Sequence, residues 1–289
     1  MLKFDSIAIK RMLPFGLTNV PAYLGAMMVQ VIDRPIVQSY LGLGAVGVYQ
    51  ANYRMGFIMM VFVSLFEYAW RPFFMRQHKT NDAEARKLFS LIFTYFMAAS
   101  LIGFLLLAFF LPYILTTPIF GRQLLPLRYM AGISIIPVVL FAYIFQGMYT
   151  NFIAGIYIEE KNRSLPFITG LGAATNVIVN LLLIPIMGIM GAAIATLAAY
   201  IVMAFAIYRV SQRAYPIAYD WSRVIKLFLI IGVAYGAERL FVLGNIINDT
   251  TILFILRLGL TAAVFIALFA FGFFSEREKK FLKEKLRIQ

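Results

Sequence analysis

The stretch LPFITGLGAATNVIVNLLLIPIMGIMGAAIATLAAYIVMAFAIY, residues 165–208, contains no charged side chain. A helix needs about 20 apolar residues to cross a hydrocarbon core of about 30 Å, so the stretch is long enough for two spans. The segment IPIMGIMG at 184–191 supplies a proline and two glycines for a turn between them. Gly191, Ala195 and Ala199 recur every four residues, which predicts close helix packing. We therefore expect a membrane-spanning helical hairpin.

The rest of the chain is similarly apolar. Of 289 residues, 62% are hydrophobic and 13% are charged, and the mean hydropathy is +0.84. These values lie outside the range of soluble globular domains. We predict an all-α polytopic membrane protein with about eight transmembrane helices. The expected spans are residues 12–41, 46–74, 88–114, 128–157, 164–186, 188–208, 224–243 and 251–274.

The 26 basic residues are distributed unevenly among the gaps between these spans. Lysine and arginine concentrate before the first span, in every second gap after it, and in the tail at 275–289. Because cytoplasmic loops carry the excess of basic residues, this pattern predicts cytoplasmic termini and an even number of spans. We interpret the net charge of +13 mostly as a topology signal. No basic soluble face is left to bind nucleic acid.

The sequence offers no ligand set for a metal ion or a cofactor. It has no cysteine, and its single histidine, His78, stands between Arg76 and Lys79 in a gap where we expect a solvated loop. It also lacks a nucleophile elbow, a phosphate-binding loop and an extramembrane catalytic domain. We therefore predict a protein that is not an enzyme and uses no metal or cofactor.

Ionisable residues inside the spans are candidate functional residues, because charges at membrane depth are costly. Asp33 and Arg34 lie in the first span, and Arg54 lies in the second. At 1.5 Å per residue, Asp33 and Arg54 each lie about 10 Å outward from the centre of their span, so they can meet in an antiparallel hairpin. Arg34 would then be free to bind an anion in a water-filled interior. A closed structural cluster of all three residues is the alternative.

Other polar residues in the spans are weaker candidates. Glu67 and Arg71 have i, i+4 spacing, so we expect them to pair along their helix, although the carboxylate could also couple transport to protons. Asn176 and Asn180 are expected to hydrogen-bond between helices, with substrate contact as the alternative. A bend is expected at Pro35. The remaining candidates for lining a cavity that accepts a hydroxyl-rich ligand are Gln50, Asn52, Tyr53, Gln146 and Tyr149.

Two segments resemble bacterial polysaccharide flippases, the exporters of lipid-linked oligosaccharides within the multidrug/oligosaccharidyl-lipid/polysaccharide (MATE-like) superfamily. The first segment matches an Asp-Arg pair, then Leu-Gly, a Gly-Tyr stretch and a helix that ends in Trp-x-Pro-Phe, at Asp33, Arg34, Leu41, Gly42, Gly47, Tyr49, Trp70, Pro72 and Phe73. The second matches an Asn-x-x-x-Asn, Ile-Pro, Gly and Gly-Ala-Ala-x-Ala-Thr pattern, at Asn176, Asn180, Ile184, Pro185, Gly188, Gly191, Ala192, Ala193, Ala195 and Thr196. The resemblance covers nearly the whole chain and is to the C-terminal half of such proteins.

The resemblance implies two six-helix lobes around a central cavity. By alternating access they would move an undecaprenyl-diphosphate-linked glycan, such as a lipopolysaccharide O-antigen precursor, across the bacterial cytoplasmic (inner) membrane. Arg34 and Arg54 would contact the diphosphate, and Asp33, Glu67 and Arg71 would support or couple transport. The sequence is expected to contain one lobe at 1–210, two additional helices at 211–274 and a basic cytoplasmic tail at 275–289.

The other lobe has no counterpart in this sequence. It would belong to a longer reading frame, be lost through a split or truncated gene, or be supplied by another copy or another polypeptide. Two other functions remain open at this point. One is a cation-coupled small-molecule exporter of the same superfamily, for which Asp33 and Glu67 are the acidic candidates. The other is a non-transporting membrane partner of a glycan-synthesis complex. A membrane enzyme would require large outer loops, which the sequence lacks.

Overall fold

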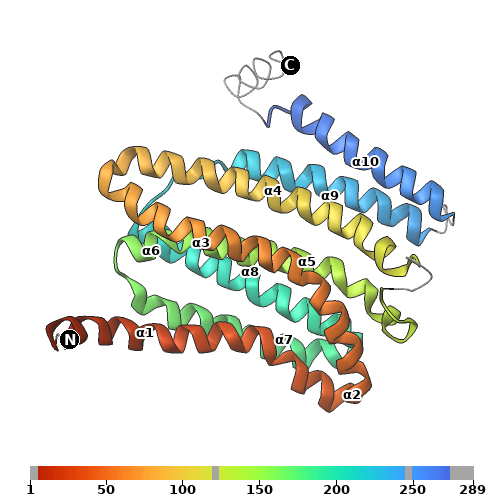
Figure 1. Cartoon of the computed structure of the whole chain (residues 1–289), viewed down its shortest axis with the longest axis horizontal. Helices are drawn as coiled ribbons and strands as arrows, with labels where there is room; N and C mark the ends of the chain where they lie inside the picture. Colours follow the sequence, from red (N-terminus) through yellow and green to blue (C-terminus); the bar gives the residue numbers. More distant parts are fainter. Residues whose placement is uncertain (1–5, 119–123, 245–248, 274–289) are drawn as a thin grey trace, which may run out of the picture.

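A computed structural model describes residues 6–118, 124–244 and 249–273, and these residues form helices without any strand (Figure 1). The chain is an all-α polytopic membrane protein, as predicted. The basic tail expected at 275–289 lies outside the described residues. The helices are α1 (Ser6–Val31), α2 (Asp33–Tyr53), η1 (Arg54–Gly56), α3 (Phe57–Thr80), α4 (Asp82–Thr116), η2 (Leu127–Ile135), α5 (Ile136–Phe152), α6 (Ala154–Ile158), η3 (Asn162–Ser164), α7 (Leu165–Met187), α8 (Ile189–Ala214), α9 (Trp221–Leu243) and α10 (Thr250–Ala270).

Six helices in the described part of the chain are long and apolar enough to cross a membrane, where the sequence predicted eight spans. The difference has two causes. The stretch Val20–Lys79 counts as one helical run of 60 residues, although it overlaps both of the first two expected spans, 12–41 and 46–74, and is kinked at Gly42. Helix α9 lies where the seventh span was expected and is long enough to be one. It is not counted because it carries Lys226, Glu238 and Arg239 among its apolar residues.

Helix α2 folds back on itself at Gly42. A straight helix would separate Asp33 from Tyr49 by about 24 Å, yet the Tyr49 hydroxyl donates a hydrogen bond to the Asp33 carboxylate. The reversal is at Gly42, whose φ of 79° and ψ of 173° are strained for residues that carry a Cβ. Near Pro35, where a bend was expected, the helix is interrupted only at Ile32, between α1 and α2, and Ile32 keeps helical φ and ψ of −67° and −22°. Proline lacks the N–H that would continue the helix there.

The hairpin expected from the uncharged stretch at 165–208 is formed by α7 and α8. Gly188 makes the turn with φ 60° and ψ −138°. At Gly191, an added Cβ would lie 2.5 Å from the carbonyl carbon of Leu183, so only glycine allows the two backbones to come this close. Ala195 and Ala199 continue the buried small-residue face. Helix α8 also packs against α5, which places the polar residues of both helices in the interior.

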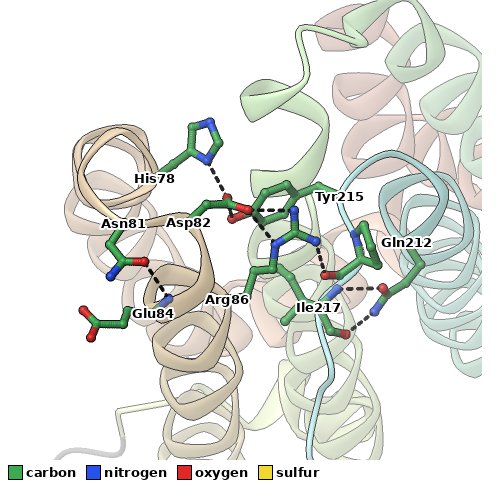
Figure 2. Close-up of polar contacts among 9 residues, drawn as sticks. His78, Asn81, Asp82, Glu84, Arg86, Gln212, Tyr215 and Ile217 are labelled. Carbon is green, nitrogen blue, oxygen red and sulfur yellow. Dashed lines mark hydrogen bonds and ion pairs between the residues drawn. The ribbon is translucent and has the colours of Figure 1, made fainter.

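Hydrogen bonds connect the segment between α8 and α9 to the corner between α3 and α4 (Figure 2). Asp82 accepts hydrogen bonds from the Tyr215 hydroxyl and from Arg86 Nε at 3.0 Å. Arg86 also donates to the carbonyl of Pro216 at 2.8 Å and stacks on the Tyr215 ring. The expectation of a solvated loop at His78 is wrong. His78 belongs to α3 and its Nδ1 lies 2.9 Å from Asp82 Oδ1, because the helix continues for one turn beyond the apolar span.

Helices α9 and α10 lie at the edge of the bundle, where α9 packs against α4 and α10 lies outermost (Figure 1). A buried ion pair joins them. Arg257 donates from Nε and Nη2 to Oε1 of Glu238, at 2.9 and 2.6 Å, and Glu238 is 0% exposed. Two-point bonding of this kind fixes the register of two helices.

Candidate functional site

Asp33 is the carboxylate buried inside the helical bundle α1–α8. It is 1% exposed, and its Oδ2 accepts the hydrogen bond from Tyr49. Its Oδ1 is also buried and has no hydrogen-bond partner among the described residues. A buried carboxylate that is not paired with a cation is costly at membrane depth. It therefore marks a position that can take up a proton or a cation.

A row of tyrosine rings extends from Asp33 across the bundle. The ring centroids of Tyr49 and Tyr53 are 5.4 Å apart, those of Tyr53 and Tyr143 are 6.4 Å apart, and Tyr200 lies 6.0 Å beyond Tyr143. The Tyr143 hydroxyl donates to the Tyr53 hydroxyl at 3.5 Å. The row connects α2, α5 and α8. Its rings are apolar except at their hydroxyl ends, and the hydroxyl of Tyr49 contacts the carboxylate.

The predicted pair of Asp33 with Arg54 is wrong. Because the chain reverses at Gly42, Tyr49 reaches the depth of Asp33, and Arg54 lies five residues further along, about 7.5 Å at the helical rise. Arg54 is exposed, and Arg34 is half-buried beside Asp33. Within the described ranges, neither arginine forms an ion pair or a hydrogen bond through its guanidinium. The structure therefore leaves both cations available to an anion.

A second polar cluster lies toward the α3–α4 end of the bundle. Arg71 Nη2 is 2.6 Å from Glu67 Oε1, so the predicted i, i+4 pair is confirmed. The Arg71 guanidinium also lies 5.4 Å from the centre of the Tyr157 ring. Tyr23 of α1 and Tyr149 of α5 lie close to the same pair. Four elements thus contribute to this cluster, which is more exposed than the one around Asp33.

The predicted amide candidates have mainly structural roles. Asn52 is buried and donates to the carbonyls of Val48 and Tyr129, which ties α2 to η2. Asn180 donates to the carbonyl and to Oδ1 of Asn176, both at 2.8 Å. The expectation of interhelical bonds from these two asparagines is wrong, because the hydrogen bonds that the structure describes for them stay within α7. Asn176 Nδ2 and Asn180 Oδ1 are buried without a partner among the described residues.

Some of the remaining candidates are less constrained. Gln50, Gln146 and Tyr149 are half-buried, and the Gln146 Oε1 atom is buried without a partner in the described part of the chain. Tyr53 is buried within the tyrosine row. Among the described residues, no three His, Cys, Asp or Glu side chains come together in a way that could hold a metal ion.

Sequence reasoning missed several residues that the structure brings together. Tyr200 and Tyr157 complete the two clusters, and nothing in their sequence context separates them from ordinary interfacial tyrosines. Glu238 and Arg257 had a detectable signal, namely opposite charges in two adjacent apolar segments.

The chain matches no family model, no curated protein and no solved structure in comparisons with each.

Proposed function

We propose that the protein is the C-terminal part of a transporter that moves a lipid-linked oligosaccharide or polysaccharide precursor across the bacterial cytoplasmic membrane. In this proposal residues 1–210 form one transport lobe, and 211–274 add two peripheral helices. A second lobe, from the same reading frame, a second copy or another polypeptide, completes the cavity. Both termini face the cytoplasm. The substrate is a glycan on an undecaprenyl-diphosphate type of carrier.

One observation carries this proposal. Arg34 is held half-buried in a membrane protein, and the acid next to it, Asp33, is engaged by the Tyr49 hydroxyl. A cation at membrane depth without a carboxylate partner is expensive unless it meets an anion. A diphosphate offers several oxygens in the geometry that a guanidinium binds best. Arg54 is exposed in η1, directly after α2, and can supply a second positive charge.

The test uses the full chain in lipid nanodiscs with undecaprenyl diphosphate as the probe. Removing a charged hydrogen-bond donor costs about 1.5–3 kcal/mol, so Arg34→Ala should weaken binding by about 10- to 100-fold. Arg34→Lys keeps the charge but loses the two-point geometry. Its affinity for the probe should lie between those of the wild type and Arg34→Ala. Arg128→Ala removes an exposed arginine that stacks on Tyr129 and serves as the control. Equal affinity in Arg34→Ala and Arg128→Ala, or no binding by the wild-type chain, would contradict the proposal.

A second candidate function is cation-coupled export of a small molecule. It is favoured by the buried Asp33 with its unpartnered Oδ1. Under this function Na⁺ or protons should change ligand binding through Asp33, and the diphosphate probe should not bind. A chain that binds neither the diphosphate nor a coupling cation would instead fit a non-transporting partner of a glycan-synthesis complex.

A further inference from the structure

Helices α9 and α10 enclose a groove of about 460 Å³ that lies apart from the two polar clusters. Its walls are almost entirely hydrocarbon, with Leu229, Val233 and Ala237 on α9 and Leu260, Ala263 and Ala267 on α10. Val233 is 71% exposed, so no described part of the protein covers it.

The two ends of the groove have different charged groups. At one end, Lys226 lines the groove and its Nζ donates to the carbonyl of Phe271 at 3.3 Å. An ammonium group has three donors, and this bond uses one of them. At the other end, the buried pair of Glu238 and Arg257 follows directly on the apolar walls. Glu238 Oε2 also lies 3.4 Å from Nε of Arg239, so the groove is bounded by Lys226 at one end and by a buried carboxylate between two arginines at the other.

The length of the groove corresponds to one leaflet of a bilayer. From Lys226 to Ala237 the helix rises about 16 Å, and the rise from Leu260 to Phe271 is the same. Half of a hydrocarbon core of about 30 Å is about 15 Å. A fatty acyl chain of a phospholipid spans this distance. A polyprenyl chain longer than one leaflet would run into the ion pair.

We propose that this groove is a specific site for one acyl chain of an anionic phospholipid, whose phosphate contacts Lys226. The ion pair sets the depth to which the chain enters, and Lys226 selects the negative headgroup. The lipid would fill the open face between α9 and α10 and so attach this pair to the leaflet on the Lys226 side. The site is independent of the transported substrate proposed above.

The experiment measures which lipids stay bound to the full chain. The protein in mild detergent is incubated with equimolar phosphatidylglycerol and phosphatidylcholine, each with palmitoyl and oleoyl chains. Free lipid is removed by size exclusion, and bound lipid is quantified by mass spectrometry. One lysine near a lipid headgroup should favour the anionic lipid by about fivefold. Lys226→Gln should bring the ratio of the two lipids close to one while retaining the total amount of lipid.

Filling the groove should remove the lipid itself. Ala263→Trp places a large ring in the groove and should lose most of the bound lipid of both types. Ala262→Trp is the matched control, because Ala262 is an exposed neighbour that does not line the groove. Val233→Trp fills the groove from the α9 wall and repeats the test if Ala263→Trp does not fold.

Three results would overturn the proposal. The first is equal lipid retention by the groove-filling variants and Ala262→Trp, and the second is an unchanged preference for phosphatidylglycerol in Lys226→Gln. The third is displacement of phosphatidylglycerol by an equal concentration of undecaprenyl phosphate, which would assign the groove to an isoprenoid chain. Because no diphosphate probe is present, none of these results depends on the proposed transport function.

Discussion

Glycine in the contact between α7 and α8 has surroundings opposite to those of glycine in the α9–α10 pair. A Cβ added at Gly191 would lie 2.5 Å from the carbonyl carbon of Leu183, and one added at Gly172 would lie 2.4 Å from the Met203 side chain. At Gly236 and Gly259, an added Cβ would meet no atom within 4 Å. Small residues in membrane helices therefore indicate close packing only where a second helix faces them. The glycines of α9 and α10 flank open space.

The buried carboxylates of the two regions also differ in how they are paired. Glu238 in α9 is paired through both carboxylate oxygens: Arg257 of α10 donates two short hydrogen bonds to Oε1, and Arg239 Nε lies 3.4 Å from Oε2. Asp33 in the bundle has only the hydroxyl of Tyr49, and Arg34 beside it is left without an ion pair in the described part of the chain. The first arrangement is a closed structural contact. The second leaves charge available for a ligand, which is why we assign function to the bundle and attachment to the α9–α10 pair.

The largest effect is expected from breaking the closed pair. Glu238→Gln leaves Arg257 buried without its counter-charge, and removing one partner of a buried pair costs about 3–5 kcal/mol. The measurement is unfolding of the detergent-solubilised chain by heat or by denaturing detergent. Asp33→Asn should cost less, because the amide oxygen can still accept the Tyr49 hydrogen bond.

Replacing both partners provides the control for this prediction. Glu238→Leu combined with Arg257→Met removes both charges and should regain most of the lost stability. If Glu238→Gln is no more destabilising than Asp33→Asn, then the two buried acids do not differ in the way that the structure indicates.

A smaller effect is expected from adding one methyl group to each kind of glycine. Gly191→Ala forces the α7 and α8 backbones apart, and overpacking of this type costs about 1–3 kcal/mol. Gly236→Ala meets open space and gains helix propensity, so it should leave stability unchanged or raise it by up to about 1 kcal/mol. The same unfolding measurement compares the two variants. Equal destabilisation of both would mean that the space beside Gly236 is occupied.

Much of the fold could be predicted from the sequence because its signals are local. The uncharged run at 165–208 and the glycines in its turn specify the α7–α8 hairpin without reference to any other element. Glu67 and Arg71 are also local, since four residues of one helix fix their separation. Pro35 indicated the position of the interruption between α1 and α2 for the same reason.

Contacts between side chains of different helices could not be predicted in this way. Placing Asp33 opposite Arg54 depended on the centres of two expected spans, and an error of a few residues there moves the contact by more than one turn. Tyr49, rather than Arg54, therefore reaches Asp33. The ion pair between α9 and α10 joins residues 19 positions apart across a turn, so its formation depends on how the two helices pack.

The smallest effect is expected at the start of α10, where Asp249 is the N-terminal cap outside the span. Its Oδ1 accepts hydrogen bonds from the backbone N–H groups of Ile252 at 3.1 Å and Thr251 at 2.7 Å, and these bonds lower the pKa of its carboxyl group. A lowered pKa in the folded state means that the cap stabilises the helix fully above the unfolded value of about 4. This contribution is lost as the pH falls through the lowered pKa.

Amide hydrogen exchange in the first turn of α10, corrected for its intrinsic pH dependence, should therefore speed up below about pH 4. Asp249→Asn keeps a capping oxygen that does not titrate in this range, so its exchange should lack this acid-dependent rise. If the wild type and Asp249→Asn respond identically to acid, the carboxylate does not control the start of α10, and the ion pair with Glu238 alone would hold this helix in register.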